Sequence, residues 1–368
     1  MAFIGVSQKA QKVLDVYIGV DGVAQKVVRA YVGDADGIAR IWWGFPSIPK
    51  ETRLASLSQT VSNIDYYYLN NTRVITFMDD PLAFKKLPEG ITFAADTGGM
   101  GYYKGTIIGD HMYICGGGLG SIICDPNMTK CFEAFVSLET INGMELLDTS
   151  EIIDLSRMFC ECRSLTSIDL SHFSNYSAKN YTRMFNNCSS LTEIDITNLF
   201  TTGGSLVSGG SRVMMFDGCS ALQTIKNGST GSSEIKISSP TDCDYMFANC
   251  SSLTTIPAVN IVSAGSDFPY LFFNCSSLTS MTLKHGASGF ADTNMRSVFE
   301  NCSSLTTVTM TAFNNTKALD MSRFFYNCSK MKNIYVNSSI WIDWDYSSQP
   351  DKATDMYSGC GVKYVSYR

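Results

Sequence analysis

The C-terminal two thirds of the chain repeats one phrase, and this repetition constrains the fold more than any other feature. "MFNNCSSLTEIDI", which begins at Met184, returns as "MFANCSSLTTIPA" at Met246, "LFFNCSSLTSMTL" at Leu271 and "VFENCSSLTTVTM" at Val298. The period of about 25 to 32 residues is the length of a structural repeat. One unit of this size cannot bury its apolar face alone, whereas a stack of units shares one continuous core. The sequence therefore predicts a solenoid.

Each unit divides into two halves around its cysteine. The half after the cysteine reads L-x-x-I-x-L, as in Leu191, Ile194 and Ile196, and its period-two alternation predicts a short strand with one buried face. The half before the cysteine reads x-M-F-x-x-C, as in Met184-Phe185, and we interpret it as a short helical or 3₁₀ turn. The predicted fold class is therefore an α/β solenoid with one short strand and one helical turn per repeat.

The repeated cysteine matches no metal-binding spacing. The chain has 13 cysteines, an odd number, and only Cys160 and Cys162 lie close together, whereas structural zinc needs two such pairs. We expect buried free thiols that act as small hydrophobes and offer a weak S–H donor to backbone carbonyls. Metal or disulfide roles are the alternative. The cysteines assigned to the repeat are Cys131, Cys162, Cys188, Cys219, Cys250, Cys275, Cys302, Cys328 and Cys360.

The phrase "MFxNCSSLTxIxL" closely resembles the BspA-like, Treponema-type leucine-rich repeats of bacterial surface proteins and their phages. The resemblance covers residues 131–368, where the first copy, "CFEAFVSLETI", and the last, "MYSGCGVKYV", are degenerate, as capping repeats are. It implies a leucine-rich-repeat solenoid that adheres to a host surface protein or glycan and does no catalysis.

Outward strand positions are the candidate ligand-contact face, because they carry Ser, Thr, Asn and scattered acids. A solvated sheet face is the alternative interpretation. The cluster "WIDWDY" at 341–346 either closes the apolar end of the solenoid or contacts a ligand. The candidate contact residues are Asp169, Asp195, Thr282, Thr309, Tyr335, Trp341 and Trp344.

A shorter repeat occupies residues 1–44. Its units begin at Phe3, Tyr17 and Tyr31, and the turns "VDGV" and "DADG" predict a small β-meander that ends at Trp42-Trp43. Tyr17, Tyr31, Trp42 and Trp43 are the candidate anchoring residues. The segment resembles N-terminal segments of structural and tail-associated proteins from prophages of gut Firmicutes. That resemblance implies docking to other virion proteins, and a segment this small and apolar also suggests a homo-oligomer.

Residues 45–130 are predicted to form a small β-rich domain, all-β like the meander, and a candidate cap for the first repeat. The acids Asp79, Asp80 and Glu89 are the only candidates there for a glycan depolymerase, and adjacent carboxylates alone are weak evidence. The glycine run "CGGGLG" at 115–120 lacks the helix that a phosphate cradle needs, so it is interpreted as a tight turn. No catalytic, metal or cofactor site is predicted.

Composition bounds the partners and the compartment. The net charge is −6 without a basic run, which argues against nucleic acid, and no stretch reaches the roughly 18 apolar residues of a membrane span. No signal peptide is visible. We therefore expect a non-enzymatic virion protein made in the bacterial cytoplasm, whose N-terminus docks to the particle and whose solenoid contacts the host. The alternatives are an extracellular or cell-surface adhesin of the BspA-like class and, third, a tail-borne glycan depolymerase.

Overall fold

The structure is a computed structural model in which the chain forms two compact units, Met1–Thr52 and Arg53–Arg368. It describes residues 16–20 and 23–27 and most of 52–367. The stretches not described in the second unit are 66, 98–102, 119, 175–177, 200–210, 229–233, 238–242, 262–266, 286–292, 311, 314, 316–317, 338, 340–352 and 363.

The described part of the first unit is one β-hairpin. Strand β1 (Val16–Val20) pairs antiparallel with β2 (Val23–Val27), and Val20 faces Val23, so the connection has two residues. A two-residue connection is the kind that the Asp-Gly turn of "VDGV" predicts. The other units of the predicted meander lie outside the described residues.

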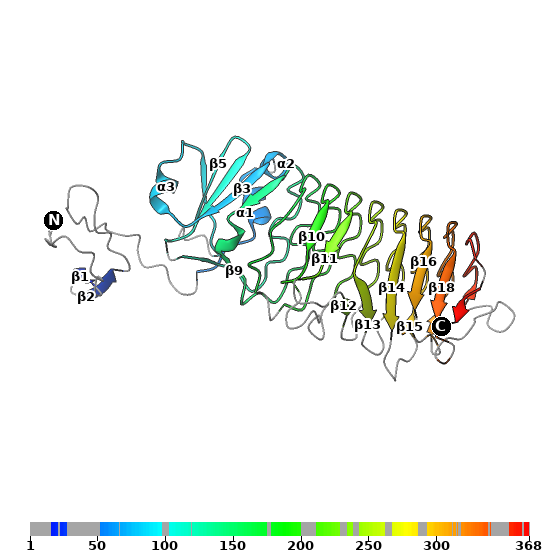
Figure 1. Cartoon of the computed structure of the whole chain (residues 1–368). Coiled ribbons are helices and arrows are strands. Elements are labelled where there is room, and N and C mark those ends of the chain that lie inside the picture. The colour runs from blue at the N-terminus through cyan, green and yellow to red at the C-terminus, as the bar shows by residue number, and fades with distance from the viewer. Residues whose placement is uncertain are drawn as a thin grey trace, which may run out of the picture. The chain divides into compact units, whose positions relative to one another are not determined.

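The second unit begins with a mixed five-stranded sheet in the order β4-β5-β6-β3-β8 (Figure 1). Three short helices accompany it, so the prediction of an all-β module is not confirmed. Asp80 explains one of them, because its side chain caps the first turn of α3 and Pro81 begins the helix. The elements are α1 (Leu57–Ile64), α2 (Tyr67–Asn71), β3 (Val74–Met78), α3 (Pro81–Lys85), β4 (Ile91–Ala94), β5 (Lys104–Ile108) and β6 (His111–Cys115).

This sheet continues directly into the repeat array. Strand β3 pairs in parallel with β8 (Thr140–Asn142), which belongs to the first repeat. Strand β7 (Ile122–Ile123) pairs with β9 (Leu147–Asp148), which follows the 3₁₀ helix η1 (Met144–Leu146). The ring of Phe77 meets that of Phe132 edge to face at 6.2 Å. Strands β3 to β7 and helices α1 to α3, which we call the N-terminal module of the second unit, thus cover the apolar end of the first repeat.

Parallel strands then line one side of the array, side by side from green to red in Figure 1. The largest sheet has the order β12-β13-β14-β16-β18-β19, and its middle strands alternate buried and partly exposed residues, as the period-two pattern predicts. The strands are β10 (Glu193–Asp195), β11 (Thr224–Lys226), β12 (Glu234–Ile237), β13 (Ala258–Ile261), β14 (Ser280–His285), β16 (Thr307–Met310), β18 (Asn333–Val336) and β19 (Ser366–Tyr367).

A second parallel ladder runs before the Met-Phe pair of the repeats. Strand β15 (Thr293–Asn294) pairs with β17 (Ala318–Asp320), and single bridges join Asn127 to Asp154 and Asp154 to Asn180. An Asx side chain at this position accepts a hydrogen bond from the amide two residues on, as Asp154 does from Ser156 at 2.8 Å. This local turn directs the chain from the strand into the tight segment that follows.

The predicted helical turn before the cysteine is wrong. Around Phe159, successive backbone amides alternate between two kinds of hydrogen bond. One kind goes to the carbonyl three residues back, as from Cys162 to Phe159, and the other goes to a carbonyl of the next repeat, as from Phe159 to Met184. The residues five and one before the cysteine, such as Arg157 and Glu161, have φ near +60°. An α-helix or a 3₁₀ helix needs negative φ throughout, and the left-handed residues interrupt this segment, so it is a run of overlapping turns. The array is a β-solenoid.

The aromatic residue that recurs in each repeat forms a continuous stack through the core. Neighbouring rings lie 5.0 to 5.8 Å apart and within 11° of parallel. All but the last are buried, so each ring covers the face of the next and excludes water along the array. The stack comprises Phe132, Phe159, Phe185, Phe216, Phe247, Phe272, Phe299, Phe325 and Tyr357.

Hydrogen bonds between repeats explain the recurring sequence Cys-Ser-Ser-Leu-Thr. In the repeat of Cys275 the thiol donates to the Phe247 carbonyl at 3.1 Å, which confirms the expected S–H donor. Ser276 donates to Ser251 at 3.3 Å, and Thr279 donates to Thr254 at 3.4 Å. Side chains of each copy of this sequence therefore donate hydrogen bonds to backbone carbonyls of the preceding copy. Backbone carbonyls that are buried need such partners.

Cys131 is not the first repeat cysteine, contrary to the assignment made from spacing. The left-handed residues that flank the phrase are Lys130 and Ala134 in the first repeat, so Phe135 occupies the cysteine position. Cys131 occupies the place that Met158 takes in the next repeat. The spacing was misleading because the distance from Cys131 to the next repeat cysteine, Cys162, is a plausible repeat length.

Candidate functional site

The outward face of the strand array brings three of the predicted contact residues together. Thr282 on β14 faces Thr309 on β16, which faces Tyr335 on β18. All three side chains are partly exposed. Because the strands are parallel and in register, equivalent positions form straight rows across the sheet.

A second row runs beside the first. Ser280 faces Thr307, and Thr307 faces Asn333, two residues before the first row on each strand. The two rows together present hydroxyl, amide and phenol groups and no charge. Threonine rotamers are restricted by branching at Cβ, so these groups are held in fixed directions. The face is a preorganised array of neutral donors and acceptors.

A charged cluster borders the rows on β12, β13 and β14. The Lys284 ammonium forms an ion pair with the Glu234 carboxylate, which also accepts from the Asn260 amide at 3.1 Å. The hydrogen bond from Lys284 lowers the pKa of Glu234, and that from Asn260 lowers it further. The Glu234 carboxylate stays ionised at neutral pH, and the opposite charges of the pair largely cancel.

The two predicted aspartates lie elsewhere and make local turns. Asp195 ends β10 and accepts from the Thr197 amide at 2.9 Å. Asp169 lies outside any strand and accepts from the Ser171 amide at 2.8 Å. Hydrogen bonds from Ser171 lower the pKa of Asp169. Each exposed carboxylate is thus engaged in turning the chain at the end of its repeat.

The remaining predicted residues fall mostly on undescribed stretches. Tyr17 lies on β1 and pairs with Lys26 in the backbone register. The others, which lie outside the described residues, are Tyr31, Trp42, Trp43, Trp341 and Trp344.

Sequence reasoning missed an amide ladder on the turn edge of the repeats. Asn274 donates to the Asn249 side chain at 2.9 Å, Asn301 donates to Asn274 at 2.8 Å, and Asn327 donates to Asn301 at 3.0 Å. Beside it, the rings of Tyr245 and Tyr270 stack at 4.4 Å. The recurring "NC" dipeptide was a visible signal for the asparagines. The tyrosine pair had none, because its position varies in chemistry from repeat to repeat.

The acids considered for catalysis in the N-terminal module have structural partners. Asp79 accepts from the amides of Gly118, at 2.6 Å, and Gly120, so the glycine run encloses the protein's own carboxylate. Asp80 caps α3 through the amides of Leu82 and Ala83. Glu89 is one of the residues that line a pocket beside helix α2.

Histidine and thiol groups offer no paired nucleophile in the described residues. The His111 ring stacks on Tyr113 at 4.0 Å, and burial lowers its pKa. Cys115 donates to the Gly116 carbonyl, and burial raises its pKa to about 12. Among the described residues, no cluster of His, Cys, Asp and Glu could hold a metal ion. None of the helices described there is long and apolar enough to cross a membrane.

The stacked repeats and parallel strands define a leucine-rich-repeat solenoid. Residues 232–342 match the family described as "BspA type Leucine rich repeat region" in six copies, so this stretch carries BspA-type repeats. Residues 126–223 match the family described as "Mycoplasma protein of unknown function, DUF285". A leucine-rich repeat protein from Bacteroides ovatus ATCC 8483 shares 16% identity at a TM-score of 0.30, over 70% of this chain and 71% of that chain. None of the curated proteins matches this chain.

Proposed function

We propose that this chain is a non-enzymatic binding protein that contacts a host surface protein or glycan through the strand face of its solenoid. The carrying observation is the register of Thr282, Thr309 and Tyr335, three polar side chains in one row across parallel strands. BspA-type repeats in residues 232–342 support the same role.

The chemistry of the rows indicates the kind of contact. Neutral hydroxyl and amide groups bind by directional hydrogen bonds, and Tyr335 adds an aromatic ring with a polar end. The one charged cluster beside them pairs Lys284 with Glu234 internally. Binding through this face should therefore depend only weakly on ionic strength, unlike binding through exposed unpaired charges.

The test uses the full chain on whole cells of gut Firmicutes and on their purified wall glycans. Thr309→Lys places a charge at the centre of the first row and should weaken saturable binding at least tenfold. Ser329→Lys is the matched control, because it makes the same kind of change at an exposed position in the tight turn before β18. Equal binding by the two variants would overturn the assignment of this face.

We further propose that residues 1–44 dock the chain to other virion proteins of a phage or prophage. The resemblance of the tandem "AQKV" units to prophage structural proteins supports this, as does the division of the chain into two compact units. Mass spectrometry of purified particles should detect the protein at a fixed ratio to a tail or capsid protein. Detection only in washed bacterial envelopes would favour the BspA-like surface adhesin instead.

A further inference from the structure

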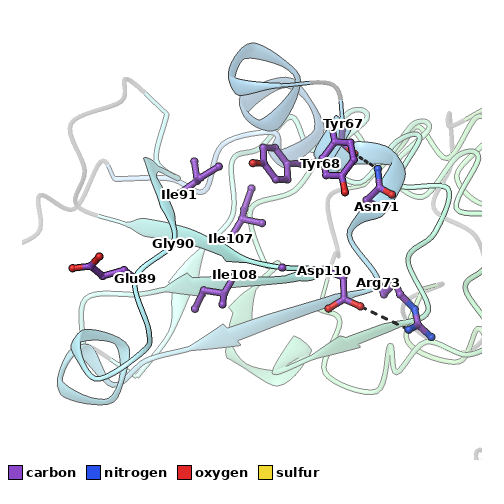
Figure 2. Close-up of a pocket in the computed structure, with 11 residues that line it drawn as sticks. Tyr67, Tyr68, Asn71, Arg73, Glu89, Gly90, Ile91, Ile107, Ile108 and Asp110 are labelled. Carbon is purple, nitrogen blue, oxygen red and sulfur yellow. Dashed lines mark hydrogen bonds and ion pairs between the residues drawn. The ribbon is translucent and has the colours of Figure 1, made fainter.

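The N-terminal module contains an open pocket of about 800 Å³, beside the five-stranded sheet and under helix α2 (Figure 2). Helix α2 supplies Tyr67 and Tyr68 on one side. The start of β4 and the end of β5 supply Ile91 and Ile107. The pocket lies on different elements from the strand face of the solenoid, so it requires its own explanation.

One wall of the pocket is aromatic and open to solvent. Tyr67 is 58% exposed, and its ring meets that of Tyr68 edge to face, with centroids 5.4 Å apart and planes at 86°. Ile91 is 39% exposed. Large apolar side chains left accessible around a hollow usually mark a ligand site, since exposing them to water is unfavourable.

The rim at the end of β5 is polar and rigid. Ile108 faces His111, so Gly109 and Asp110 form a two-residue hairpin turn, and Gly109 has the positive φ of +63° that this turn requires. The Asp110 carbonyl accepts from the Arg73 amide at 2.8 Å, which ties the turn to β3. The Asp110 carboxylate is therefore held at the mouth of the pocket.

The positive charge of Arg73, at the rim of the pocket, is balanced by neighbouring carboxylates. Arg73 Nε and Nη2 donate to Glu139 at 2.8 to 3.0 Å, and Nη1 lies 3.7 Å from Asp110. The hydrogen bonds that Arg73 donates to the Glu139 carboxylate raise the pKa of Arg73. The lining also contains Glu89, an exposed carboxylate. The pocket thus offers hydrogen-bond acceptors in a negative field, which disfavours an anionic ligand.

Two glycines, Gly90 and Gly109, line the pocket. A Cβ on Gly90 would lie 2.4 Å from the Ile107 carbonyl oxygen, so β4 can approach β5 at this point only without a side chain. A Cβ on Gly109 would meet nothing within 4 Å. The turn therefore has open space on the side to which a side chain at Gly109 would point.

From this geometry we propose that the pocket binds a neutral sugar, one or two residues of a glycan. A pyranose ring has an apolar C–H face that fits against Tyr67 and Ile91, and hydroxyl groups that donate to Asp110, Glu89 and Asn71. This site is independent of the strand face, and its failure would leave the proposed function of that face untouched.

The test measures binding of soluble oligosaccharides to the full chain by saturation-transfer NMR and calorimetry. The probes are N-acetylglucosamine dimers to tetramers and the neutral disaccharides lactose, maltose and cellobiose, with a glucuronate-containing disaccharide as the anionic counterpart. We expect saturable binding of at least one neutral probe, and at least tenfold weaker binding of the anionic one. Failure of every neutral probe, or preference for the anionic probe, would overturn the proposal.

Variants locate the binding within the chain. Tyr67→Ala should weaken binding of the neutral probe at least tenfold, whereas Tyr67→Phe keeps the ring and should stay within about threefold of the original affinity. Tyr364→Ala is the matched control, since Tyr364 is also a well-exposed tyrosine, at 73%, in the last repeat. Equal losses in Tyr67→Ala and Tyr364→Ala, or none in Tyr67→Ala, would overturn the pocket assignment.

Discussion

The repeated cysteine joins neighbouring repeats while remaining neutral. In the repeat of Cys275 the thiol donates to the carbonyl of Phe247, the ring-bearing residue of the preceding repeat, and burial raises the pKa of Cys275 to about 12. Burial disfavours the thiolate, so the proton is retained over the whole physiological range. A cysteine suits this place because it is small enough for the core and still carries a donor.

The raised thiol pKa predicts a loss of stability at alkaline pH. An unfolded thiol ionises near pH 8.5, whereas Cys275 in the fold retains its proton to about pH 12. Between these values the unfolded state binds fewer protons, so the free energy of unfolding falls as pH rises, by about 1.4 kcal/mol per pH unit for one thiol. Urea unfolding at pH 9, 10 and 11 measures this slope.

Cys275→Ala is the control for other groups that titrate in this range. It should reduce the slope by the share of one thiol, about 1.4 kcal/mol per pH unit, although it also lowers stability at pH 7. An unchanged slope would contradict a buried, protonated Cys275.

The asparagine before the cysteine adopts a left-handed backbone conformation and also joins neighbouring repeats through its side-chain amide. Asn274 has φ +60° and shares an amide ladder with Asn249 and Asn301. Asn274→Gly keeps the backbone conformation and loses only the ladder, so we expect a cost of about 1 kcal/mol. Asn274→Ala also strains the left-handed backbone, by about a further 1 kcal/mol. Chemical denaturation of the two variants separates the two contributions, and equal stabilities would remove the backbone argument.

This position also shows what the sequence could reveal. Asparagine and glycine before the cysteine are residue types that tolerate positive φ, and they recur visibly. The other left-handed position, five residues before the cysteine, holds Arg157, Tyr245 and Ser297 in different repeats. No shared chemistry marks it, because its conformation is imposed by bonds to the neighbouring repeat. The helical interpretation failed for that reason.

At the scale of the elements, strands were predictable and turns were not. Apolar and polar residues alternate in Thr307–Met310 because one face of the strand is buried in the core, as in any sheet with one face toward solvent. The contact row was likewise visible as outward strand positions, but its register with Tyr335 depends on pairing between distant residues. Asp169 and Asp195 looked equivalent to that row, and only the structure reveals their turn-forming bonds.

The aromatic stack is the element that most tightly couples one repeat to the next. Phe247 is fully buried between Phe216 at 5.6 Å and Phe272 at 5.3 Å. Phe247→Ala removes both contacts and opens a cavity, so we expect a loss of about 3 to 5 kcal/mol. Within the described part of the chain, Tyr357 is the last ring of the stack; it is partly exposed and stacks on Phe325.

Tyr357→Ala therefore serves as the comparison and should cost about 1 to 2 kcal/mol, since less apolar area is lost. Guanidinium unfolding followed by circular dichroism measures both variants. Similar losses at the two positions would mean that stacking does not propagate stability along the array.

At the scale of the whole molecule, the N-terminal module acts as a cap. Removing it would expose the edge of β8 that pairs with β3, and the face of Phe132 that Phe77 covers. Exposed strand edges and apolar repeat ends promote aggregation, which is why solenoids carry terminal caps. The repeats, the cap and both proposed binding sites therefore lie within one unit, Arg53–Arg368.

Two truncations test this arrangement. Residues 53–368 keep every pairing of the second unit, so this fragment should be monomeric and should unfold at the thermal midpoint of the second unit in the full chain. Residues 126–368 contain every repeat but lack β3 and β7, and this fragment should aggregate or unfold at least 10 °C lower. Size-exclusion chromatography and thermal unfolding distinguish the outcomes. A stable monomer of 126–368 would show that the array closes its own end, and the sheet of β3 would then be an appended domain whose pocket serves binding alone.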